Sequence, residues 1–118
     1  MQDFRKLKVW QANRQFTLQI YKLTAKYPPE ERFGLVSQMR RAVVRIGACI
    51  AEGCGKRTRR DTRNHFQTSF GGACEMPYHL ITSLDLTYIT QQEFDDADAK
   101  CLESRKMLSR LMWRLGGD

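Results

Sequence analysis

The residues with the most distinctive chemistry are basic, and they crowd into one short stretch of the chain. Positions 40–63 hold eight basic residues, seven of them arginine, against two acidic ones. The eight are Arg40, Arg41, Arg45, Lys56, Arg57, Arg59, Arg60 and Arg63. A guanidinium can hold a phosphate through two parallel hydrogen bonds, whereas a lysine ammonium is a hydrated point charge. The stretch therefore predicts a nucleic-acid-binding surface; the alternatives are a solubilising face and ion pairs with the rest of the chain.

Within this stretch, Gly53-Cys54-Gly55-Lys56-Arg57-Thr58 has a superficial likeness to a phosphate loop. A true loop of this kind follows a strand and needs Gly, four residues and then Gly-Lys-Ser/Thr. Here position 50 is Ile and position 57 is Arg, and we expect no ATP site. The weaker prediction is a single phosphate at the start of the helix that follows. A helix-turn-helix whose second helix begins with residues 59–64 is a further alternative.

The spacing of the cysteines and histidines does not indicate a metal site or a reactive thiol. Cys49, Cys54, Cys74 and Cys101 form no Cys-x-x-Cys pair, and the two histidines complete no zinc pattern. We expect no metal, no cofactor and reduced thiols that pack in the interior.

Three acid–base candidates remain, Glu52, Glu75 and His79, the last one helical turn after Glu75. They could act in acid–base chemistry, but we expect the glutamates to be partners for Arg40, Arg41 or a helix end, and Glu75 and His79 to form a hydrogen-bonded pair. We find no catalytic motif and no small-molecule substrate site, so the chain is predicted not to be an enzyme.

The charge of the whole chain of 118 residues follows the same pattern. Its formal net charge is +7; residues 1–63 hold 15 basic and 5 acidic side chains, and residues 64–118 hold 5 and 8. No apolar stretch approaches the roughly 20 residues that cross a membrane, and the charged first residues lack the apolar core of a secretory signal. We expect a single cytoplasmic domain over residues 1–118, with no membrane partner.

Apolar residues at helical spacing predict four helices that position these side chains. The first would run from about Asp3, as its N-cap, to Lys26, and end at Pro28-Pro29. The second would follow Glu30 and end at Gly53 and Gly55, with glycine in a left-handed cap.

The third helix would start at Thr58 and either kink or divide at Pro77. The capping box at Thr90 would open the fourth, which would end at Gly116-Gly117. Short links between helices imply an all-α, antiparallel up-down four-helix bundle. Leu102, Met112 and Trp113 make the fourth helix more apolar than one bundle requires, which predicts an interface between copies.

Several strings of residues are similar to a known family. They are Phe4-x-x-Leu7-x-Val9-Trp10, Ile20-Tyr21-x-Leu23-Thr24, Tyr27-Pro28-x-x-Glu31, Phe33-Gly34-Leu35-x-x-Gln38-Met39-Arg40-Arg41-Ala42, Ile50-Ala51-Glu52-Gly53 and Gly71-Gly72-x-x-Glu75-Met76. The chain resembles the four-helix-bundle proteins encoded in intervening sequences of bacterial 23S rRNA genes, which are also similar to accessory proteins of diversity-generating retroelements. The resemblance implies a cytoplasmic bundle that oligomerises into a ring, a homopentamer, with a basic surface for RNA or DNA and no catalytic activity.

The resulting prediction is an oligomeric, non-enzymatic nucleic-acid-binding protein. Its contacts would be mainly to phosphates, with little sequence preference, because no base-reading element is evident. The alternative is an oligomeric scaffold whose basic face docks an acidic protein, or a reverse transcriptase or RNA–protein complex.

Overall fold

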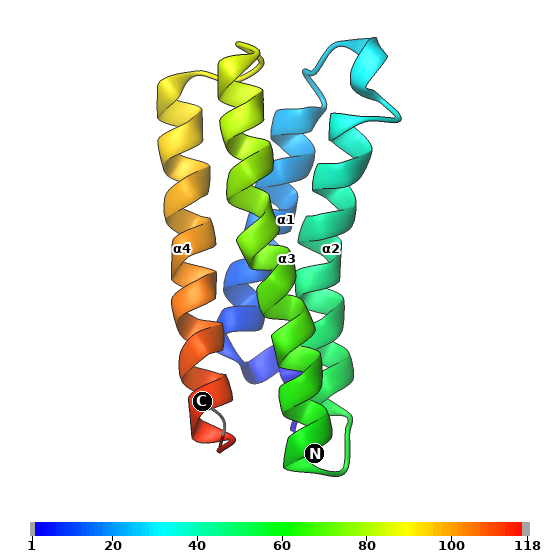
Figure 1. The fold of residues 1–118 in the computed structure, drawn as a ribbon, viewed down its shortest axis with the longest axis vertical. Helices are drawn as coiled ribbons and strands as arrows, with labels where there is room; N and C mark the ends of the chain where they lie inside the picture. The colour runs from blue at the N-terminus through cyan, green and yellow to red at the C-terminus, as the bar shows by residue number, and fades with distance from the viewer. Residues whose placement is uncertain (1, 117–118) are drawn as a thin grey trace.

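The computed structural model describes residues 2–116, which form four long helices and two single turns of 3-10 helix and contain no strand. The helices are α1 (Lys8–Thr24), α2 (Leu35–Cys54), α3 (Arg59–Asp85) and α4 (Gln91–Arg114), and the turns are η1 (Phe4–Lys6) and η2 (Pro29–Glu31). Consecutive helices run in opposite directions, each packs against the next, and α4 closes onto α1 (Figure 1). The result is a four-helix bundle of 44 × 23 × 22 Å, which confirms the all-α prediction.

The core follows the apolar stripes of the sequence. Met39, Val43, Ile46 and Ile50 of α2 are fully buried, as their spacing predicts. Helix α3 lies close to α2 because Gly72 faces it: a Cβ at this position would come within 3.1 Å of Ile46 Cγ1. Buried polar groups also join the helices. Ser69 Oγ donates to the carbonyl oxygen of Ile46 at 2.8 Å, and Asn13 Nδ2 donates to that of Val43 at 3.2 Å.

The start of the chain departs from the prediction. Asp3 accepts a hydrogen bond from Arg5 N and caps η1, whereas α1 begins only after Leu7, whose backbone is extended. The break lets the Phe4 ring pack edge-on against Trp10, with 5.0 Å between ring centroids. A bond from Gln2 N to the carbonyl oxygen of Cys54 ties this segment to the end of α2. A single helix from Asp3 to Lys26 was therefore wrong, because the contacts of this segment with Trp10 and with the end of α2 outweigh helix continuation.

The turn between α2 and α3 also differs in detail from the prediction. Gly53 lies inside α2 and is buried, and a Cβ there would meet the side chains of His65 and Phe66 at about 3.0 Å. Gly55 ends the helix with φ −86°, an ordinary right-handed conformation, so the predicted left-handed cap was wrong. Gly116, after α4, does adopt φ +87°, while Gly117 lies outside the described residues.

Helix α3 is continuous through Pro77, so the alternative of two segments was wrong. Proline has no N–H, which leaves the carbonyl oxygen of Ala73, four residues earlier, without its usual helical donor. The thiol of Cys101 on α4 donates to this oxygen at 3.1 Å. Burial raises the pKa of Cys101 to about 11, so the thiol keeps its proton.

The predicted starts of α3 and α4 are confirmed. The side chain of Thr58 accepts from Asp61 N, and Thr90 and Glu93 form the full capping box of α4. These caps fix where the bundle turns. Within residues 2–116, no helix is long and apolar enough to cross a membrane.

Candidate nucleic-acid interface

The up-and-down topology gathers basic residues from separate parts of the sequence at one end of the bundle. The start of the chain, the α2–α3 turn and the last turns of α4 share this end (Figure 1). We call it the basic end, and it comprises Arg5, Lys6, Lys8, Lys56, Arg57, Arg59, Arg60, Arg63, Arg110 and Arg114. The sequence prediction included only the residues between Lys56 and Arg63. The others could have been found from the predicted helix order. In an up-down bundle, the start of the first helix, the turn between the second and third, and the end of the fourth lie at the same end.

The α2–α3 turn is a tight helix ending and not a phosphate loop. The N–H groups of Gly55 and Lys56 donate to the carbonyl oxygens of Glu52 and Gly53, both at 3.1 Å. Thr62 Oγ1 donates to the same Gly53 oxygen at 2.8 Å, which fixes α3 against the end of α2. Because these two N–H groups are engaged, they are not available to wrap a nucleotide phosphate.

The first turn of α3 is the more open part of this end. Lys56, Arg57, Arg59 and Arg60 are exposed, and the first three line a hollow of about 340 Å³ beside Thr58. The first N–H groups of a helix lack helical partners, and its N-terminus carries a partial positive charge. Arginines there are electrostatically unfavourable, and an anion would relieve the repulsion. The first turn of α3 also holds one acidic residue, Asp61, as that of α4 holds Glu93; the difference is that α4 has no arginine in its first turn and carries Arg114 in its last.

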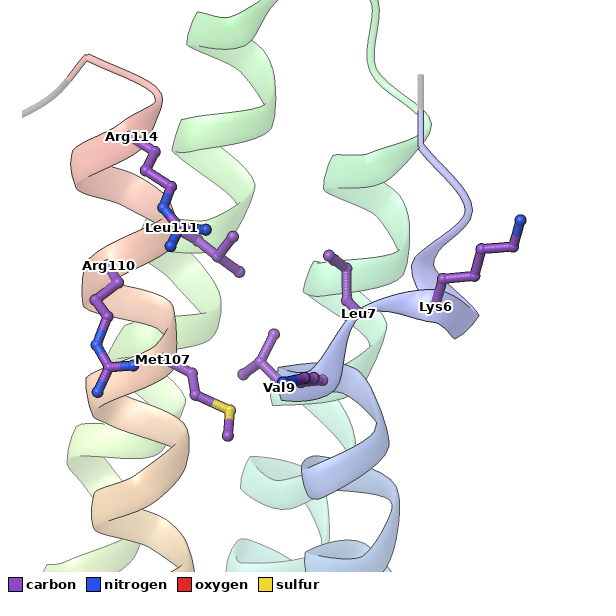
Figure 2. Close-up of a pocket in the computed structure, with 8 residues that line it drawn as sticks. Lys6, Leu7, Val9, Met107, Arg110, Leu111 and Arg114 are labelled. Carbon is purple, nitrogen blue, oxygen red and sulfur yellow. The ribbon is translucent and has the colours of Figure 1, made fainter.

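A second hollow, of about 390 Å³, lies between the start of α1 and the end of α4. Figure 2 shows Leu7 and Val9 on one side, and Met107 and Leu111 facing them from α4. Four basic residues line this apolar floor, namely Lys6, Lys8, Arg110 and Arg114, although the side chain of Lys6 points away from it in Figure 2. The hollow extends the basic end across α4. It exists because α1 begins only at Lys8, which leaves the last turns of α4 partly uncovered.

The arginines of α2 do not join the basic end. Arg40 and Arg41 lie in the first half of α2, and Arg45 near its middle, because the helix begins at Leu35. Arg40 Nε donates to Thr24 Oγ1 at 3.0 Å and Nη2 to the carbonyl oxygen of Tyr21 at 3.3 Å. It therefore holds the end of α1, while Arg41 and Arg45 are exposed. The eight basic residues of positions 40–63 therefore do not form one cluster in the fold, contrary to the single surface predicted from the sequence.

The acid–base candidates pair with histidines. Glu75 Oε2 lies 2.7 Å from His79 Nε2, and Glu52 Oε2 lies 3.6 Å from His65 Nε2. The Glu75–His79 pair matches the prediction. Glu52 was expected to pair with Arg40, Arg41 or a helix end, but it is exposed and lies near His65 of α3.

The four cysteines are free thiols, and within the described residues no group of three or more potential ligands could hold a metal ion. Burial raises the pKa values of Cys49 and Cys54, as it does for Cys101. Cys74 is the exposed member of the set. Desolvation therefore disfavours the reactive thiolate at the three cysteines with raised pKa values.

Two surface predictions need correction. Met112 is buried in the core of its own bundle, so only Leu102 and Trp113 of the predicted interface set are exposed. The helix-turn-helix alternative also fails, because α3 packs lengthwise between α2 and α4 and does not stand out as a recognition helix.

Comparisons with known proteins agree with this architecture. The model of the family described as 23S rRNA-intervening sequence protein matches residues 5–110. A similar solved structure is the crystal structure of a protein of unknown function from the S23 ribosomal protein family of Bacteroides thetaiotaomicron. It is 23% identical, with a TM-score of 0.82, over 89% of this chain and 95% of that chain. No curated protein matches.

Proposed function

The chain belongs to the family of 23S rRNA-intervening sequence proteins, and from this premise we propose that it is a non-enzymatic, oligomeric protein that binds RNA or DNA through phosphates. The observation that carries the proposal is the basic end. Three parts of the bundle contribute cations to it, and Lys56, Arg57 and Arg59 surround a hollow at the open N-terminus of α3. This arrangement suits a polyanion of any sequence, since it offers charge and backbone donors without a base-reading element.

The proposed residues contribute unequally. Lys56, Arg57, Arg59 and Arg60 are exposed and would contact phosphates directly. Arg63 lies one turn further along α3 and adds to the local positive potential. Arg40, Arg41 and Arg45 lie outside this end, so phosphates bound there would occupy a separate part of the surface.

The oligomer in this proposal is a ring of copies packed side by side, a pentamer by family resemblance. Exposed apolar side chains on opposite sides of the bundle support it. Leu18 and Val44 are 66% and 45% exposed on the α1–α2 side, and Ile81 and Leu102 are 49% and 42% exposed on the α3–α4 side. Contacts through these sides leave both ends of the bundle open. Sedimentation showing only a monomer at micromolar concentration would refute this part of the proposal.

A salt titration of binding tests the central claim. If six phosphates are neutralised, the logarithm of affinity for duplex DNA should fall against the logarithm of salt concentration with a slope of about −5. The double variant Arg57→Glu/Arg60→Glu should make this slope shallower by about two. The matched control is Lys22→Glu/Lys100→Glu, which changes the net charge equally but lies away from the basic end. Equal effects of both doubles, or no binding at low salt, would contradict the proposal.

A second candidate function is a docking scaffold for an acidic protein. The hollow in Figure 2 favours it, because Leu7, Val9, Met107 and Leu111 form an apolar floor inside a basic rim. An acidic amphipathic segment would match both features. Titrating the protein against RNA, duplex DNA and an acidic protein at matched salt separates the two functions by which ligand binds most tightly.

A further inference from the structure

An exposed aromatic ring stands at the other end of the bundle. Phe33, in the connection between η2 and α2, is 88% exposed, and the Arg32 guanidinium lies 5.3 Å from the centre of its ring. Exposure of a large ring to this extent costs solvation free energy and contributes nothing to the core. A ring that is flat, accessible and next to a cation has the features of a stacking platform for a nucleobase.

The surroundings of Phe33 form a basic and aromatic hollow of about 450 Å³. Tyr21 is 39% exposed in it, and the Arg40 guanidinium lies 4.5 Å from the centre of the Tyr21 ring. Arg41 and Arg32 complete the cationic lining, and no acidic residue is among the side chains that line the hollow. We call Tyr21, Arg32, Phe33 and Arg41 the aromatic patch. Its charge complements an anion, and its rings provide flat apolar area.

The patch stands on fixed elements. Glu31, two residues before Phe33, accepts from Leu35 N at 3.2 Å and from the Tyr88 hydroxyl at 2.9 Å. Its carboxylate is thereby directed toward the start of α2 and the α3–α4 connection. The bond from Tyr88 to this carboxylate raises the Tyr88 pKa, so the phenol remains the donor. Beneath the hollow, Arg40 is held by Thr24 and Tyr21, which leaves Arg41 exposed to meet a ligand.

We propose that the aromatic patch binds single-stranded nucleic acid, with one unpaired base stacked on Phe33 and the adjoining phosphate held by Arg41 and Arg32. The inference rests on the proposed function and deepens it by naming the class of nucleic acid. A duplex keeps its bases stacked on one another and cannot offer a base face to Phe33, so the patch selects unpaired strands. The patch also gives a binding role to Arg41 of α2, which lies away from the basic end.

The test compares variants of Phe33 on two labelled ligands, a 12-nucleotide oligouridine and a blunt RNA duplex of 12 base pairs. Phe33→Ala should weaken binding of the single strand about 5- to 100-fold and leave duplex binding and the salt slope unchanged. Phe33→Leu keeps apolar bulk but no ring and should lose nearly as much, whereas Phe33→Trp should retain binding. Tyr78→Ala is the matched control, since Tyr78 is an aromatic residue 69% exposed on α3.

Several outcomes would overturn the inference. One is an equal loss of affinity for the single strand and the duplex in Phe33→Ala, and another is full binding of the single strand by Phe33→Leu. A change in the sedimentation of Phe33→Ala would show instead that the patch is a contact between copies. Tight binding of an acidic peptide that depends on Phe33, without binding of the oligouridine, would also overturn the inference. If the basic-end variants lose binding while Phe33→Ala does not, only this inference fails. If the unaltered protein binds neither ligand at low salt, the proposed function fails with it.

Discussion

The contact between Cys101 and Ala73 yields a sharp test of what keeps α3 continuous. Cys101 is fully buried and its thiol lies 3.1 Å from the carbonyl oxygen that Pro77 cannot serve. Removing the thiol by Cys101→Ala leaves that oxygen without a donor in the interior. A buried unsatisfied polar group costs about 1–3 kcal/mol, and loss of the sulfur atom adds a packing cost of about 1 kcal/mol.

The two costs can be separated by restoring the missing donor. In a Pro77→Ala background, the new N–H of residue 77 can donate to Ala73, so the oxygen no longer depends on the thiol. Cys101→Ala should then cost only the packing part. We therefore expect a coupling free energy of about 1–2 kcal/mol between Cys101 and Pro77. Pro77→Ala alone should stabilise the bundle by up to about 3 kcal/mol, since it adds a bond and removes a clash.

Urea unfolding of the four proteins of this cycle, followed by far-UV circular dichroism, measures the coupling. In thermal unfolding the same difference corresponds to about 3–5 °C per kcal/mol for a domain of this size. Cys54→Ala is the control, because Cys54 is also buried but lies at the end of α2. Its cost should be the same in both backgrounds. An equal cost of Cys101→Ala in both backgrounds would refute the proposed function of the thiol as substitute donor.

Three further predictions concern stability and thiol reactivity. Gly71→Ala should stabilise the bundle by about 0.5–1 kcal/mol, because a Cβ there meets nothing within 4 Å. Gly72→Ala should destabilise it, because a Cβ there would lie 3.1 Å from an α2 side chain. Equal urea midpoints for the two variants would contradict this prediction. Lys26 holds the pKa of Glu93 below its ordinary value of 4.5, so this contribution to stability is present above that pH and is lost as the pH falls through the lowered value. The gap in unfolding free energy between the wild type and Glu93→Gln should therefore shrink as the pH falls from about 5 toward 3, and a constant gap would argue against the pair. A thiol reagent should modify the exposed Cys74 first, so Cys74→Ser should abolish the fast phase of the reaction. A fast phase that survives in this variant would show that another thiol is accessible.

Periodicity and capping chemistry were sufficient to predict the bundle. The apolar stripe of α2 and the caps at Thr58 and Thr90 are local signals, and local signals decide where long amphipathic helices begin and which face they bury. The break at Leu7 was not predictable in this way. It depends on Phe4 reaching Trp10, and on the bond from Gln2 N to Cys54 O, which joins residues far apart in the sequence.

The candidate site was only partly visible in the sequence, because spacing along the chain is not spacing in the fold. Arg41 and Arg57 belong to one arginine-rich stretch, yet α2 carries them toward opposite ends of the bundle. Conversely, Arg110 and Lys8 are distant in sequence and line the same hollow. The glycine turn shows a different limit: its residue types resemble a phosphate loop, but the N–H groups of Gly55 and Lys56 bond to carbonyl oxygens at the end of α2.

The uneven charge along the bundle has a consequence for the proposed ring. At the end opposite the basic end, Asp85, Asp95 and Asp96 flank the α3–α4 connection. A rotation axis parallel to the bundles would bring every basic end to the same rim, since rotation keeps the direction of each bundle.

Repulsion within such a rim opposes assembly at low salt, and a bound polyanion relieves it. Assembly and polyanion binding should therefore be coupled, each strengthening the other. Sedimentation at low salt should show more assembly when a short oligonucleotide is added, and the Arg57→Glu/Arg60→Glu variant should assemble without it. If the variant instead assembles less well than the unaltered protein, the arginines are not crowded at a common rim, and an arrangement with alternating bundle directions would replace the ring described here.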